Sequence, residues 1–165
     1  MNILIAELDR FQLATKNMKE LLSEIDEDIF HKKPSEKEWS VAQIASHVKE
    51  AILFWLDDIR ALQIVPEAKW GRNMEHVRRL AAVADRVTEN LTPKMAIKNL
   101  DGLDEVVTHI FTTITEDQLK TITNSYNPNF DGKPLSFIVE HLIVTHAEGH
   151  YDQMVRHLAK VKASH

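Results

Sequence analysis

The sequence predicts an all-α protein, an up-and-down four-helix bundle with a short additional helix between the second and third long helices. Apolar residues recur at alternating steps of three and four over four long segments, which is the period of amphipathic helices. The chain has only four glycines and five prolines, and no alternating strand pattern competes with the helical one. At 165 residues without repeats or a linker, residues 1–165 are expected to form a single domain.

The first two helices are predicted over residues 2–29 and from residue 41 to about residue 63. The segment HKKPSEKEWS separates them, and Ser40 followed by Gln43 has the spacing of a capping box at the start of the second helix. Thr15 is the polar exception on the first apolar stripe. The predicted inward residues are Leu4, Leu8, Phe11, Met18, Leu22, Ile25 and Ile29, then Val41, Ile44, Val48, Ile52, Trp55 and Ile59.

The second half of the chain repeats the pattern. Residues 73–91 carry many charges and predict the shorter, peripheral helix. Thr92 and Pro93 form an N-cap and a first helical position, and so predict a third long helix. The loop TNSYNPNFDGKP precedes the last helix. The predicted inward residues are Ala96, Leu100, Leu103, Val107, Ile110 and Ile114, then Leu135, Ile138, Leu142, His146, His150 and Met154.

Composition excludes several functional classes. The net charge is −5 and the basic residues are scattered, so nucleic acid is not an expected partner. No apolar run approaches the ~18 to 20 residues that a membrane span needs, and acidic residues come early in MNILIAELDRF, so a cytoplasmic location is predicted with no membrane partner. Without cysteine, any chemistry must come from histidine, carboxylate or hydroxyl groups.

Two histidines in the segment THAEGHYDQ have the spacing of metal ligands. His146 and His150 lie four residues apart, which places their Cβ atoms about 5 to 6 Å apart on one helix face. They continue the stripe of the last helix and are expected to point inward, where imidazoles need partners. The alternative is that both are histidines at the edge of the core, bonded to carboxylates or carbonyls.

His47 is a third inward histidine, beside Ile44 and Val48 on the second helix. It lies about 10 Å along the helix from Ser40, and the pair lies about 15 to 21 Å along the last helix. In an up-and-down bundle the second and fourth helices run parallel, so the levels nearly match if the last helix starts somewhat higher. Three buried imidazoles at one level are hard to keep without an ion. The sequence is not that of a zincin, since Ala147 stands where the glutamate base would follow His146.

Two stretches resemble the DinB/YfiT-like superfamily. They are WSVAQIASH at residues 39–47 and HAEGHYDQ at residues 146–153, a histidine, three residues, a histidine, two residues and a glutamine. Many members have a run such as His-Arg-Gly where this chain has Tyr151-Asp152, and Gly149 stands where a further histidine is frequent. The helix number, order and length also agree with the family over nearly the whole chain.

The resemblance implies a four-helix bundle, often a homodimer, that binds a divalent metal, zinc or nickel, through His47, His146 and His150. Three imidazoles would leave an open position for water or a small-molecule substrate. Several relatives are transferases or isomerases that use a low-molecular-weight thiol, so the resemblance implies a metal-dependent thiol transferase or a related hydrolase.

Two further residues are candidates for a supporting role near the metal. Glu50 lies one turn beyond His47 and Gln153 lies one turn beyond His150, from where each could hold an imidazole tautomer or accept a proton. For Glu50 a solvated carboxylate is the competing interpretation. For the whole chain, the competing hypothesis is a non-catalytic bundle or dimerisation protein, in which the metal or the hydrogen-bonded histidines only stabilise the helices.

Overall fold

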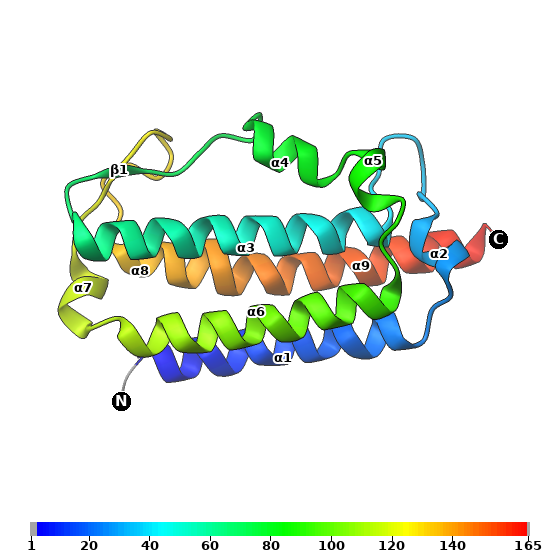
Figure 1. Ribbon diagram of the computed structural model, residues 1–165, viewed down its shortest axis with the longest axis horizontal. Helices are drawn as coiled ribbons and strands as arrows, with labels where there is room; N and C mark the ends of the chain where they lie inside the picture. Colours follow the sequence, from blue (N-terminus) through cyan, green and yellow to red (C-terminus); the bar gives the residue numbers. More distant parts are fainter. Residues whose placement is uncertain (1–2, 165) are drawn as a thin grey trace.

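Four long helices form the bundle in a computed structural model that describes residues 3–164 (Figure 1). They are α1 (Ile3–Ser23), α3 (Val41–Ile64), α6 (Pro93–Thr113) and a last helix made of α8 (Leu135–Phe137), the π-helical segment η1 (Ile138–Thr145) and α9 (His146–Ala163). The all-α four-helix bundle is confirmed. Among residues 3–164, no helix is both long and apolar enough to cross a membrane.

The chain connects the long helices in an order other than strict alternation. Both α1 and α3 pack against α6 and α9. Helices α3 and α6 run in the same direction, because residues 65–92 carry the chain back along the outside of the bundle (Figure 1). The last helix therefore runs opposite to α3, and not parallel to it as simple alternation would require. It extends past the start of α3, which allows its middle to stand level with the first turns of α3 (Figure 1).

The first predicted helix is interrupted. Residue 2 lies outside the described residues, α1 ends at Ser23, and a separate helix α2 (Glu27–His31) follows. Asp26 causes the new start, since its carboxylate accepts a hydrogen bond from the backbone N–H of Ile29 as an N-cap. The apolar spacing continues through this position and predicted one helix, but the N-cap at Asp26 starts a second one.

The predicted helix over residues 73–91 is two short helices, α4 (Val77–Ala82) and α5 (Asp85–Thr88). His76 caps α4 by accepting a hydrogen bond from the N–H of Arg78, and Ala84 is extended between the two helices. The segment lies over α3, and the amide of Gln43 donates a hydrogen bond to the carbonyl of Val83. A further short helix, α7 (Glu116–Lys120), follows α6.

Two short strands correct the expectation of a chain without them. β1 (Lys69–Trp70) and β2 (Asn124–Ser125) pair in parallel. The pair joins the segment that follows α3 to the loop that precedes the last helix. The indole N–H of Trp70 donates to the hydroxyl of Thr123 at 2.8 Å, and the ring stacks on Phe130. Gly71 follows with φ of 95°, where a Cβ would lie 2.7 Å from the hydroxyl of Ser125.

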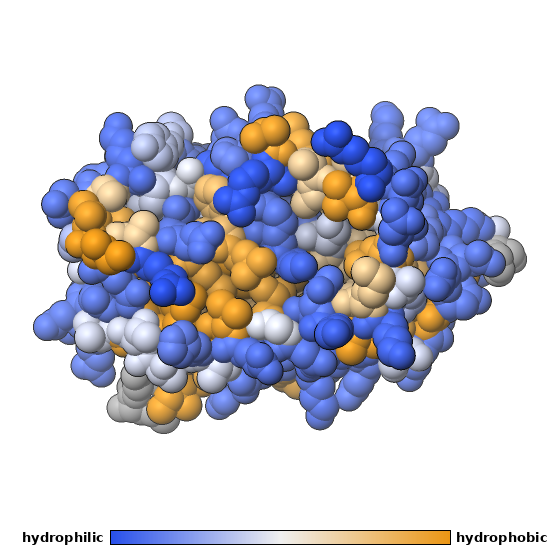
Figure 2. Space-filling model, in the orientation of Figure 1, coloured by the Kyte–Doolittle hydropathy of each residue, from blue (hydrophilic) through white to orange (hydrophobic). Residues whose placement is uncertain are grey.

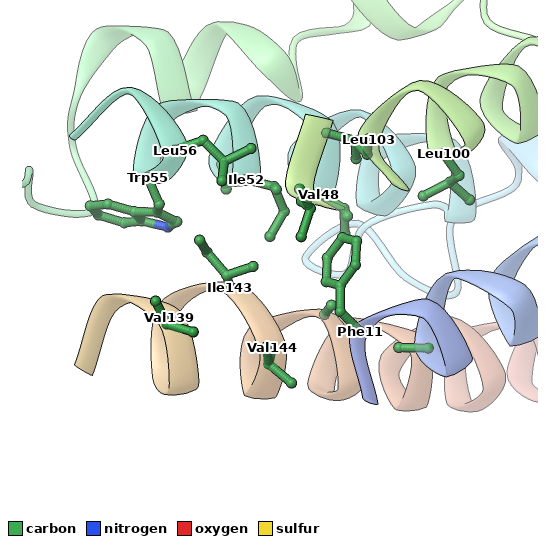
Figure 3. Close-up of a cluster of buried hydrophobic side chains, with 14 of the residues drawn as sticks. Phe11, Val48, Ile52, Trp55, Leu56, Leu100, Leu103, Val139, Ile143 and Val144 are labelled. Atoms are coloured by element: carbon green, nitrogen blue, oxygen red, sulfur yellow. The ribbon is translucent and has the colours of Figure 1, made fainter. Parts of the chain in front are cut away.

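The core is formed by the predicted apolar stripes (Figure 3). Phe11 is fully buried among residues of α3, α6 and the last helix. The polar Thr15 on the first stripe is also fully buried, and its hydroxyl donates to the carboxylate of Asp104 on α6 at 2.6 Å. Figure 2 shows polar side chains around the margins and an apolar patch between α3 and α6 on one face of the molecule.

A half-buried carboxylate on α3 predicts a pH-dependent stability. Asp58 accepts a hydrogen bond from the backbone N–H of Gly71 at 3.2 Å, and burial raises the pKa of Asp58 from 3.8 to about 6. A raised carboxyl pKa stabilises the fold while the group is protonated, and this contribution is lost as the pH rises through about 6. Asp58→Asn keeps the acceptor without the charge, so at pH 7.5 it is expected to raise the free energy of unfolding by about 1 to 2 kcal/mol.

Urea unfolding of wild type and Asp58→Asn at pH 4 and pH 7.5 measures the effect. The difference is expected at pH 7.5 and should nearly vanish at pH 4. The exposed neighbour Asp57, changed to Asn, is the matched control and should alter stability by less than about 0.5 kcal/mol at either pH. An Asp58→Asn variant that is less stable than wild type at pH 7.5 would contradict the prediction.

Candidate metal centre

His47 is placed by the start of α3. The capping box is present in both directions, with the Ser40 hydroxyl accepting from the backbone N–H of Gln43 and the side-chain Oε1 of Gln43 accepting from the backbone N–H of Ser40. This cap sets the register of α3, so that His47 falls on the side facing the last helix. The residue is only 3% exposed, and its Nδ1 atom has no hydrogen-bond partner among residues 3–164.

The π-helical segment η1 directly precedes the two other histidines. A π-helix bonds residue i to i+5 and so turns the following residues away from the positions that a regular α-helix would give them. The buried residues of α9 are Ala147, Met154, His157 and Val161, while His146 and His150 are half-buried. Their spacing predicted that the two histidines would lie on the central stripe of the core. They lie instead at its edge.

The structure brings the three predicted ligands together. One nitrogen from each of His47, His146 and His150 lies within 4.8 Å of the others, and this is a group that could hold a metal ion. The Nε2 atoms of His146 and His150 are 2.7 Å apart, and the His47 ring stands edge-on to both.

Hydrogen-bond partners on the far side of two rings favour one tautomer for each ring. His146 donates from Nδ1 to the carbonyl oxygen of Leu142 at 3.1 Å. His150 has Nδ1 2.7 Å from Oε1 of Gln153, which accepts. A neutral imidazole that donates from Nδ1 has a lone pair on Nε2. Both rings therefore present acceptor atoms to each other, as ligands of a shared cation would.

All three imidazoles are held neutral. Burial is the main cause, and the neighbouring histidines add to it; together they lower the pKa of His47 to about 2 and that of His146 to about 3. Burial likewise lowers the pKa of His150. A neutral imidazole is the form that binds a metal, so near pH 7 no proton has to be displaced from these atoms.

A cavity of about 350 Å³ opens beside the histidines. Its walls come from the sides of α3 and the last helix and from the two segments that β1 and β2 join. Sequence reasoning missed most of these residues, among them His141. Arg72, Met74 and Arg79, from the segment that covers α3, also line the cavity.

The two candidate supporting residues have different surroundings. The side chain of Gln153 is hydrogen-bonded to His150, which is one of the predicted ligands. The carboxylate of Glu50 pairs with the guanidinium of Arg72, with Nη1 at 2.8 Å and Nη2 at 2.5 Å, and has no hydrogen bond to a histidine among the described residues. Glu148, between the two histidines in the sequence, points away and pairs with Arg10 on α1.

The fold and the three histidines give the class of this protein, a helical bundle with a candidate metal centre between α3 and α9. Comparison with known proteins identifies the family. The model of the DinB superfamily matches residues 10–154, so the chain belongs to this superfamily. No curated protein gives a significant match.

A solved structure shares the fold. YfiT from Bacillus subtilis, described as a probable metal-dependent hydrolase with an unusual four-helix bundle topology, superposes with a TM-score of 0.76. The two chains are 16% identical, and the match covers 97% of this chain and 87% of that one.

The contact between Gln153 and His150 predicts an effect on metal affinity. Residues that bond the outer nitrogen of a metal-binding histidine typically contribute 10- to 100-fold in affinity. Gln153→Ala is therefore expected to weaken zinc binding about 10-fold or more, as measured by competition with a chelating dye. Gln12→Ala, on the other side of the bundle, is the control and should leave the affinity unchanged. Equal affinities for both variants and wild type would contradict a supporting role for Gln153.

Proposed function

We propose that this protein is a metal-dependent enzyme with His47, His146 and His150 as the ligands of a zinc or nickel ion. Its activity would be hydrolysis or the transfer of a group with the help of a small thiol. Membership of the superfamily, a group of three histidines that could hold a metal, and an adjoining cavity support this proposal.

The observation that carries the proposal is the pair of Nε2 atoms at 2.7 Å. With Nδ1 of His146 donating to a carbonyl and Nδ1 of His150 facing Oε1 of Gln153, no proton is left between them. Two lone pairs at this distance, in a half-buried site, repel each other unless a cation lies between the rings. The third imidazole, His47, would complete a three-histidine set, which is typical of catalytic sites with an open position.

The chain's own residues supply the surroundings for such chemistry. A divalent cation bound there would supply Lewis-acid chemistry. Leu142 and Gln153 hold two rings in the tautomer that leaves Nε2 free. Arg72 is held by Glu50 at the wall of the cavity. A cavity of about 350 Å³ is within the range of small-molecule sites.

Two reactions fit this site. The printed description of YfiT as a probable metal-dependent hydrolase favours hydrolysis. A thiol-dependent transfer is favoured by the resemblance in the sequence, and the low-molecular-weight thiol would then be the second substrate. The homodimer, the cytoplasmic location and the single domain are further proposals that accompany this assignment.

Metal content tests the proposal. Protein purified without added metal is expected to contain one zinc or nickel ion per chain by elemental analysis, and His47→Ala is expected to contain far less. Native protein without metal would contradict the proposal. It would favour the non-catalytic alternative, in which a turned Gln153 amide donates to Nδ1 of His150 and the Nε2–H of His150 donates to His146.

A further inference from the structure

The cavity beside the three histidines is rich in positive charge. Arg72 and Arg79 both line it, and within residues 3–164 no aspartate or glutamate does. Both guanidinium groups therefore share one cavity with the three candidate metal ligands.

Arg72 is already neutralised. Its guanidinium forms two hydrogen bonds to the carboxylate of Glu50, and its side chain is only 2% exposed. The guanidinium also lies 4.1 Å from the centre of the Phe54 ring. Its charge is thus balanced and its position is held from several sides, so Arg72 is part of the wall.

Arg79 is not neutralised in this way. It is half-buried, and among the described residues its one hydrogen bond is from Nη1 to the carbonyl oxygen of Met74 at 3.0 Å. Within the described part of the chain, no carboxylate lies within ion-pair distance of it. The guanidinium stands 5.7 Å from the centre of the Trp39 ring, which is itself 5.1 Å from that of His47.

The surroundings act against an isolated cation at this position. Burial, and then repulsion by Arg72, lower the pKa of Arg79, although a guanidinium stays protonated at neutral pH. A divalent cation at the three neutral imidazoles adds more positive charge nearby, and in a partly buried site the repulsion is screened less than in water. An anionic ligand in the cavity would offset both charges. A guanidinium binds carboxylate and phosphate oxygens through two parallel hydrogen bonds.

We infer that Arg79 binds the carboxylate or phosphate group of a small-molecule substrate whose reacting group lies at His47, His146 and His150. This inference deepens the proposed function and rests on it for the reacting end of the substrate. It adds the substrate class, a small oxyanion, and assigns its recognition to the segment that covers α3.

Anion titrations test the inference on the full chain, in metal-free and zinc-loaded form. Succinate and inorganic phosphate serve as probes, and the uncharged succinamide serves as the neutral counterpart. Calorimetry is expected to detect binding of at least one anion and no binding of succinamide. Arg79→Gln is expected to weaken anion binding about tenfold or more. Comparison of the two anions distinguishes carboxylate from phosphate recognition.

A matched variant separates local recognition from overall charge. Arg86→Gln removes the same charge from an exposed position on α5 in the covering segment, and should leave anion affinity within about twofold of wild type. Circular dichroism confirms that both variants are folded. Zinc affinity of Arg79→Gln, measured without anions, is expected to equal or exceed that of wild type, because a repulsive charge has been removed.

Several results would overturn the inference. These are anion binding that survives in Arg79→Gln, equal binding of succinamide, equal losses in the two arginine variants, or a parallel loss of zinc affinity in Arg79→Gln. Failure of the proposed function gives a different pattern. In that case no variant binds zinc stoichiometrically, while the metal-free protein still binds the anion and depends on Arg79 for it.

Discussion

His146→Ala is expected to lose stoichiometric metal binding and to keep its helix content. The substitution removes one of the two Nε2 atoms that face each other at 2.7 Å. Loss of a residue that merely supports a ligand already costs 10- to 100-fold in affinity, so loss of the ligand itself is expected to cost more than about 100-fold. Elemental analysis and dye competition measure the loss, and far-ultraviolet circular dichroism measures the helix content.

The control for His146→Ala comes from the same cavity. His141→Ala removes an imidazole that lines the cavity outside the three-histidine group, and it is expected to retain the metal. The melting temperature then distinguishes a catalytic from a structural ion. A catalytic site loses activity with a small change in melting temperature, while a structural site loses mainly stability. If His146→Ala retained one ion per chain, the three-ligand assignment would be wrong.

Phe11→Ala is expected to lower the free energy of unfolding by about 3 to 5 kcal/mol. Phe11 has no exposed surface and lies where α1 meets the interior residues of the other helices (Figure 3). Removing the ring loses its transfer from water and leaves a cavity, because packed helices collapse only in part around a missing side chain. Urea unfolding followed by circular dichroism measures the change.

An exposed position on the same helix is the control for Phe11→Ala. Leu13 is 57% exposed, and alanine is a good helix former, so Leu13→Ala should change stability by less than about 0.5 kcal/mol. A loss below about 1 kcal/mol in Phe11→Ala would mean that the interior repacks around the change, and would contradict a tightly packed centre of the bundle.

The long helices could be predicted from the sequence because their signals are local. The apolar period and the Ser40 and Gln43 cap depend only on neighbouring residues, and the structure has α3 beginning at Val41 as predicted. The predictions failed where a local backbone feature interrupted the period. Asp26 caps a new helix within the first stripe, and the extended residue Ala84 divides residues 73–91 into α4 and α5.

The candidate site could likewise be predicted from the sequence only in part. The spacing of His146 and His150 and the position of His47 on its helix marked all three residues. The cavity could not be predicted in this way, because the sequence pattern around Arg72 and Arg79 indicates only a charged, peripheral segment. Their role depends on how that segment folds back over α3, and on Trp70, which ties it to the loop before the last helix.

By itself, the sequence determined where the long helices lie, which faces they bury and which histidines have the position and spacing of ligands, because period, caps and spacing act within a few residues of chain. Only the tertiary structure decided the direction of α6, the π-helical turn before His146, the pairing of Glu50 with Arg72 and the exposure of Arg79 to the cavity. Those features depend on contacts between residues far apart in the chain, whose free energies no local pattern encodes.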